Sequence, residues 1–138
     1  MSTTSVNPSE LTLYDSVIAV LGAIHEEPSK MKDDNISIEA CYRAFSRLAC
    51  EFPDDFPGLY FSLQGGVPYS TKLENILFRI GAWGLVRENN PDYLLFTIPK
   101  HVKELIRQEL IRLHGGETGI KHYQELSLKF KTLLENTQ

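Results

Sequence analysis

The residues that could bind a metal or transfer protons are spread thinly along this sequence. Its four histidines are scattered, at His25, His101, His114 and His122. The His114-x-x-Glu117 spacing could supply two ligands to one ion, but it passes through two glycines and lacks the rigidity of a helix. We therefore expect neither a metal site nor a cofactor.

The two cysteines, Cys41 and Cys50, fall nine positions apart on one predicted helix. Because nine residues turn a helix through about 900°, the two thiols face opposite sides and are poorly placed to pair. Cys41 belongs to an apolar stripe and is predicted to be a core thiol, whereas Cys50 is predicted to be partly exposed.

Groups suited to acid–base or nucleophilic catalysis are also lacking. The adjacent carboxylates Glu26-Glu27, Asp33-Asp34 and Asp54-Asp55 lie in or beside predicted loops, where charge is normally solvated. Ser70 precedes a predicted helix and is explained as its cap, and Gly65-Gly66 is not followed by the Lys-Ser/Thr of a phosphate loop. We expect that the chain is not an enzyme; an active site shared across an oligomer interface is the alternative.

Length and charge narrow the class of protein. A chain of 138 residues suits one domain, and no apolar run approaches the roughly 20 residues that span a bilayer. The first ten residues lack the basic and apolar regions of a secretion signal, so we expect a cytoplasmic protein without membrane contact. Residues 1–60 carry four basic and ten acidic side chains and residues 61–138 carry ten and eight, which argues against a general nucleic-acid binder.

Hydrophobic periodicity predicts five helices. The first runs from Ser9 to about Glu27, and the second opens at Ser37 after a polar loop. A connector over residues 52–68 is rich in proline and glycine, with a possible short strand at 59–63. Three of its aromatic residues are expected to pin it to the body: Phe56, Tyr60 and Phe61. The third helix starts at Ser70 or Thr71, buries Leu73, Ile76, Leu77 and Ile80, and closes at Gly84.

The rest of the chain predicts a small hairpin and two more helices. Residues 85–88 and 93–98 are predicted strands around an Asn/Pro/Asp turn, and helices follow at 99–114 and about 118–135. The fold class is therefore mainly α with a small β-hairpin, a winged-helix-like domain with a C-terminal helical extension. It forms one domain over 1–138, with a flexible N-terminus at 1–8 and the extension at 99–138.

One segment resembles a known protein family. The run Gly65-Gly66-Val67-Pro68-Tyr69-Ser70-x-x-Leu73-x-x-x-Leu77, followed by Gly84-Leu85-Val86, is similar to the Gly-Pro-Tyr-Ser segment, amphipathic helix and Gly-Leu-Ile exit of the Panacea (SocA-like) antitoxin-associated domains. The resemblance covers about residues 50–98, and Val67 here stands between the glycine and the proline. It implies a bacterial antitoxin or adaptor that acts through protein contacts and has no catalytic residues.

The outward face of the third helix is the predicted binding surface. With Leu73 at the centre of the buried stripe, Phe78 points outward beside an arginine, a combination typical of an interface anchor. Packing of Phe78 under the connector is the alternative. The predicted partner-binding residues are Tyr69, Lys72, Asn75, Phe78, Arg79 and Arg87.

Two functions follow from this surface. The main hypothesis is a non-enzymatic regulatory module, antitoxin-like or adaptor-like, that binds a protein partner through the third helix and the aromatic connector. The alternative is a winged-helix DNA-binding transcriptional regulator, in which the polar members of the same set contact phosphates and base edges. We also expect a homodimer, because Ile111 and Leu128 fall off the main apolar stripes of the last two helices.

Overall fold

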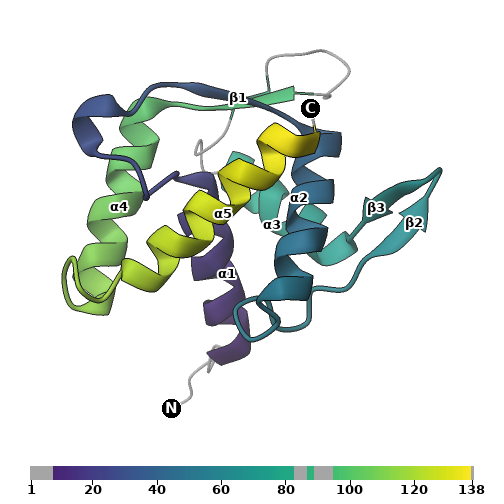
Figure 1. The fold of residues 1–138 in the computed structure, drawn as a ribbon, viewed down its shortest axis with the longest axis horizontal. Helices are drawn as coiled ribbons and strands as arrows, with labels where there is room; N and C mark the ends of the chain where they lie inside the picture. The colour runs from purple at the N-terminus through teal and green to yellow at the C-terminus, as the bar shows by residue number, and fades with distance from the viewer. Residues whose placement is uncertain (1–7, 83–86, 89–94, 138) are drawn as a thin grey trace.

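The computed structural model describes residues 8–82, 87–88 and 95–137, which form five helices and two small antiparallel sheets (Figure 1). The α-helices are α1 (Pro8–Leu21), α2 (Ile38–Glu51), α3 (Thr71–Ala82), α4 (Lys100–His114) and α5 (Lys121–Thr137). The strands are β1 (Asp34–Ser37), β2 (Ser62–Gln64), β3 (Val67–Tyr69), β4 (Arg87–Glu88) and β5 (Leu95–Ile98), and a 3₁₀ turn spans Pro28–Lys30. The predicted class, mainly α with a small β-hairpin, is confirmed. The predicted helix end at Gly84 and the turn at 89–92 lie outside the described residues.

Local sequence signals set the starts of α2 and α3. The Ser37 hydroxyl accepts a hydrogen bond from the Ala40 N–H at 3.3 Å, and the Ser70 hydroxyl accepts one from the Leu73 N–H at 3.1 Å. Each bond satisfies a backbone donor that the first turn of a helix leaves free. Both predicted caps are therefore confirmed.

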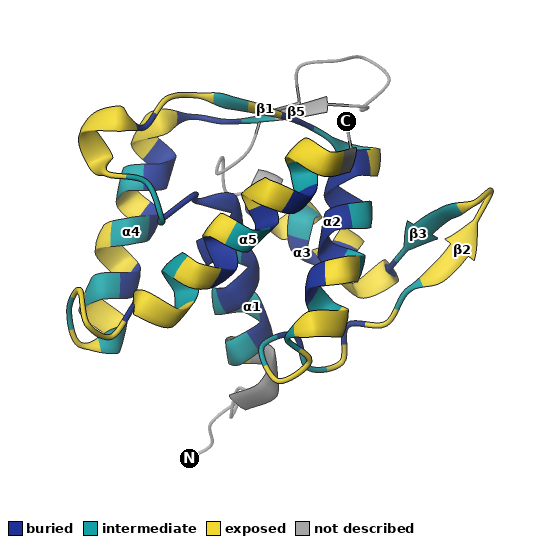
Figure 2. Cartoon of the chain, viewed as in Figure 1, coloured by how far each residue is buried: buried dark blue, intermediate teal, exposed yellow. Residues whose placement is uncertain are grey.

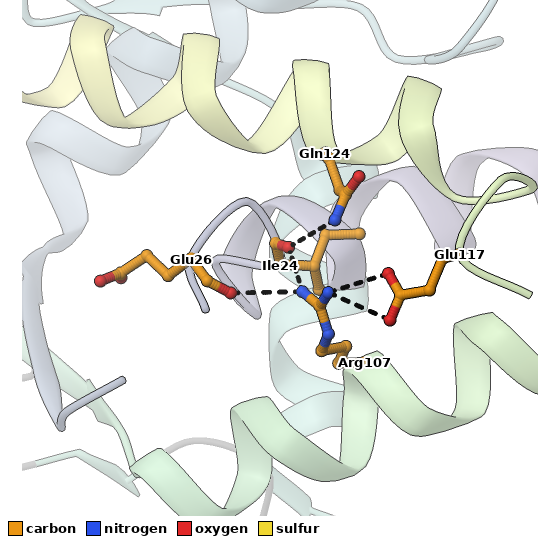
Figure 3. A network of polar contacts seen from close by, with 5 residues as sticks. All are labelled: Ile24, Glu26, Arg107, Glu117 and Gln124. Atoms are coloured by element: carbon orange, nitrogen blue, oxygen red, sulfur yellow. Dashed lines mark hydrogen bonds and ion pairs between the residues drawn. The ribbon is translucent and has the colours of Figure 1, made fainter. Parts of the chain in front are cut away.

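Helix α1 is shorter than the periodicity predicts, since it ends at Leu21 rather than near Glu27. A Cβ at Gly22, just after α1, would lie 2.9 Å from the Ile106 side chain of α4, so a larger residue there would force a shift. Ala23 then adopts a positive φ of 50° and turns the chain out of the helix. Arg107 of α4 binds the backbone carbonyls of this turn (Figure 3).

The core lies where α5 crosses α1 and α2, with α4 packed beside α1 (Figure 1). Phe45 of α2 is fully buried and contacts Phe130 of α5, with ring centroids 4.7 Å apart. The buried sides of these helices face one another, and their exposed sides face outward (Figure 2). The spacing of apolar residues in α4 predicts a buried stripe of Val102, Leu105, Ile106, Leu110 and Leu113. Leu105 and Leu113 are exposed instead, while Lys103 is fully buried.

The connector between α2 and α3 is held at fewer points than predicted. Phe56 is buried and meets the Phe45 ring edge-on at 6.1 Å, and Phe61 is half-buried against the core. Tyr60 is 83% exposed, so the prediction that it pins the connector is wrong. The rest of the connector forms a second hairpin, β2 and β3, around Gly65 and Gly66, both at positive φ.

The other sheet has the strand order β1-β5-β4, all antiparallel. Strands β4 and β5 are the predicted hairpin. Strand β1 falls in the segment predicted as a polar loop, and it exists because Asp34 to Ser37 pair with Ile98 to Leu95 on the far side of β5. Within the residues described, no helix combines the length and the apolar character needed to cross a membrane.

Candidate functional site

One side of α3 turns away from the core and carries most of the predicted binding residues. Leu73, Ile76 and Ile80 are buried on the opposite side of the helix. Phe78 is 77% exposed, which excludes the alternative that it packs under the connector. We call the exposed residues Lys72, Asn75, Phe78 and Arg79 the α3 face.

The spacing of the α3 face brings its members side by side. Asn75, Phe78 and Arg79 stand at positions i, i+3 and i+4, which neighbour one another on a helix surface. Lys72 extends the row by one turn towards the start of the helix. The result is an aromatic side chain flanked by an amide and a guanidinium on the exposed side of the helix.

Tyr69 is placed differently from the α3 face, because it is half-buried at the end of β3. Its ring stacks on Tyr42 of α2, with centroids 5.7 Å apart and planes 29° apart. Its hydroxyl donates to Glu74 Oε1 at 2.7 Å, and this hydrogen bond raises the pKa of Tyr69. Tyr69 therefore joins the hairpin to α2 and to the first turn of α3, next to the start of the α3 face.

Arg87, the sixth predicted residue, lies in β4, where its backbone pairs with Thr97 of β5. Its side chain is outside the described part of the chain. The structure thus brings four of the six predicted residues together on α3 and places Tyr69 at the base of that helix.

The charge on α3 is mixed. Lys72 and Arg79 are cationic, and the exposed Glu74 between them is anionic. Burial raises the pKa of Tyr14 on α1, and the positive charge of Arg79 partly opposes this shift. The helix surface is weakly positive and does not form the dense basic stripe that phosphate binding favours.

The β2–β3 hairpin carries a second exposed apolar side chain, which hydrophobic periodicity in the sequence does not reveal. Leu63 is 74% exposed, and the whole of β2 is exposed (Figure 2). The signal that could have found the hairpin is Gly65-Gly66, a two-residue turn between two short apolar stretches.

A cavity of about 290 Å³ opens between the end of α1, β1 and α5. Its walls include Val20, His25, Ile36, Ser127 and Phe130. His25 Nδ1 lies 2.6 Å from Ser127 Oγ, and burial lowers the pKa of His25. His25 Nε2 has no hydrogen-bond partner among the described residues, so this pair lacks the third group of a hydrolytic triad there.

The two other histidines with polar contacts join separate helices and loops. His114 Nε2 lies 3.1 Å from Asp15 Oδ2, and His122 Nε2 lies 2.7 Å from Asp55 Oδ2. In the part of the chain that the structure describes, no three His, Cys, Asp or Glu side chains are grouped to hold a metal ion. Cys41 is buried and Cys50 is exposed, as predicted.

Comparison of the chain with protein-family models, with curated proteins and with solved structures returned no match.

Proposed function

We propose that this chain is a non-enzymatic regulatory module, antitoxin-like or adaptor-like, that binds a protein partner through the α3 face. The observation that carries the proposal is Phe78, a large aromatic side chain that is 77% exposed on a helix whose opposite side is buried. Aromatic residues and arginine are enriched at the energetic centres of protein interfaces. Phe78 and Arg79 supply both on adjacent positions.

The setting of Phe78 supports this role. The buried side of α3, with Leu73 and Ile80, holds the helix on the core, so the backbone that carries the exposed ring is already in place when a partner binds. Tyr69 and Glu74 fix the hairpin against the first turn of the same helix. A partner that covers Phe78 therefore meets a surface that is already ordered.

We expect Phe78→Ala to weaken the complex with the partner by about 30-fold, the effect of truncating an interface anchor worth about 2 kcal/mol. The product of a neighbouring gene is the first partner to test, by co-purification after nuclease treatment and then by titration calorimetry. The free energy of unfolding should change by less than about 0.5 kcal/mol, because the side chain is exposed.

The matched control is Leu128→Ala, which removes an exposed apolar side chain from α5. It should leave partner affinity unchanged. A large loss of stability in Phe78→Ala would show that the ring is part of the core, and unchanged affinity would remove Phe78 from the interface.

The topology of the three-stranded sheet favours a second candidate function, a winged-helix DNA-binding regulator. Strand β1, between α1 and α2, pairs with β5. Strands β4 and β5, which would form the wing, directly follow α3 along the chain. In this reading Lys72, Asn75 and Arg79 contact DNA, with Arg87 of the wing assisting.

Salt dependence of DNA binding separates the two functions. If α3 binds phosphates, Lys72→Ala and Arg79→Ala should each reduce the slope of log K against log salt concentration by about one. The measurement is fluorescence anisotropy with DNA from the chain's own promoter. Lys121→Ala, which removes an exposed lysine at the start of α5, is the control. Equal slopes for all three variants would remove α3 from any DNA interface.

A further inference from the structure

The outer edge of β2 is an open strand edge. Among the described residues β2 pairs only with β3, in a two-stranded sheet. The hairpin projects away from the helices beside α2 (Figure 1), and all three residues of β2 are exposed (Figure 2). Exposed strand edges tend to pair with other strands unless charge, proline or a covering segment prevents it.

The register of the hairpin shows which backbone groups point outward. The pairs are Ser62–Tyr69, Leu63–Pro68 and Gln64–Val67. Because proline has no N–H, Leu63–Pro68 cannot exchange two hydrogen bonds and is the non-hydrogen-bonded pair of the ladder. The N–H and C=O of Leu63 therefore point away from β3, towards the open edge.

The two edges of this hairpin are not equivalent. On β3, Pro68 offers no N–H at the position that faces outward, and Tyr69 is stacked on α2. On β2, the middle residue Leu63 presents both a donor and an acceptor, and its own side chain is 74% exposed. Strand addition is therefore directed to β2.

The charge pattern favours a second copy of this chain as the occupant of this edge. Residues 56–71 contain no charged side chain, although the whole chain has a net charge of −4. Two copies carry the same net charge, and along this uncharged segment they can approach without bringing like charges together. Since the hairpin projects from the body, contact at its edge also keeps the charged surfaces apart, and salt screens charge beyond about 8 Å.

We propose that two copies of the chain associate through β2, side by side and antiparallel, about a two-fold axis at Leu63. The two Leu63 residues then form a hydrogen-bonded pair, each donating its N–H to the C=O of the other. The assembled sheet has four strands, with β3 of each copy at its outer edges. The α3 face takes no part in this contact, so the dimer does not depend on the partner proposed above.

Sedimentation equilibrium of the full chain tests this dimer. Leu63→Pro removes the outward N–H but no hydrogen bond within the hairpin, and Leu63→Lys places a charge on the edge. Both variants should raise the dissociation constant of the dimer at least about tenfold. Leu128→Lys, the same change at an exposed leucine of α5, should leave it unchanged.

Cross-linking tests the register independently of any effect on folding. In a Cys50→Ser background, Leu63→Cys should be joined to its copy by a short bis-maleimide, because the two positions face each other across the axis. Leu128→Cys in the same background should not be joined. A wild-type chain that stays monomeric at its highest concentration overturns the proposal, as does a dimer dissociated by Leu128→Lys and not by Leu63→Lys.

Discussion

Replacement of Asp34 by alanine is expected to lower the free energy of unfolding by about 3 kcal/mol, although Asp34 lies on a strand near the surface. Its carboxylate accepts a hydrogen bond from the ammonium group of Lys103, whose side chain is fully buried. Removing the carboxylate leaves an unpaired charge inside the protein, where charge is poorly solvated. Urea denaturation measures the loss, which corresponds to a fall in Tm of roughly 10 °C.

The double variant Asp34→Ala/Lys103→Met is the control for this prediction. Methionine fills much of the volume of lysine without its charge, so the double variant should recover most of the stability lost by Asp34→Ala. If both variants are equally unstable, the loss comes from packing and not from the unpaired ammonium group. If Asp34→Ala is harmless, Lys103 does not depend on this carboxylate.

Replacement of Arg107 by alanine is expected to cost about 3 kcal/mol, from two charge-assisted hydrogen bonds of about 1.5 kcal/mol each. One terminal nitrogen, Nη1, donates to the carbonyl oxygens of Ile24 at 2.6 Å and Glu26 at 3.2 Å (Figure 3). These carbonyls belong to the turn that follows α1. Thermal unfolding should show the loss, and Arg107→Lys should not restore it, because the lysine side chain is one bond shorter and its Nζ falls short of the position of Nη1.

The matched control is Glu117→Ala, which removes the other partner of the same arginine. Arg107 Nη2 donates to Glu117 Oε2 at 3.0 Å, but the glutamate side chain is 65% exposed. An exposed ion pair contributes at most about 1 kcal/mol, so the control should change stability little. If Glu117→Ala were as harmful as Arg107→Ala, the ion pair and not the carbonyl contacts would hold the turn.

These two contacts hold together the elements around the core of this mainly helical chain. Lys103 binds β1 to α4, and β1 completes the sheet that contains the β4–β5 hairpin. Arg107 binds the same helix to the end of α1, and Gln124 of α5 donates to the Ile24 carbonyl at 3.3 Å. Side chains of α4 and α5 therefore hold β1 and the turn after α1 against the core.

Local signals in the sequence were enough to predict that five helices form, where α2 and α3 begin, and one face of the candidate site. The serine caps of α2 and α3 act within three residues, and the stripe of Leu73, Ile76 and Ile80 leaves Phe78 outside the core. The same reasoning placed Cys41 in the core and Cys50 at the surface. Periodicity, capping and turn residues depend on neighbours along the chain, so the sequence displays them directly.

Tertiary structure alone decided the features that depend on distant residues. Strand β1 needs β5 as its partner, and the burial of Lys103 needs Asp34, 69 positions away. Gly22, which follows the end of α1, lies so near α4 that a Cβ there would be 2.9 Å from the Ile106 side chain. The exposure of Tyr60 depends on how the connector lies against the helices, which only the folded structure shows. None of these contacts leaves a pattern in a short window of sequence, because each is set by two segments that only folding brings together.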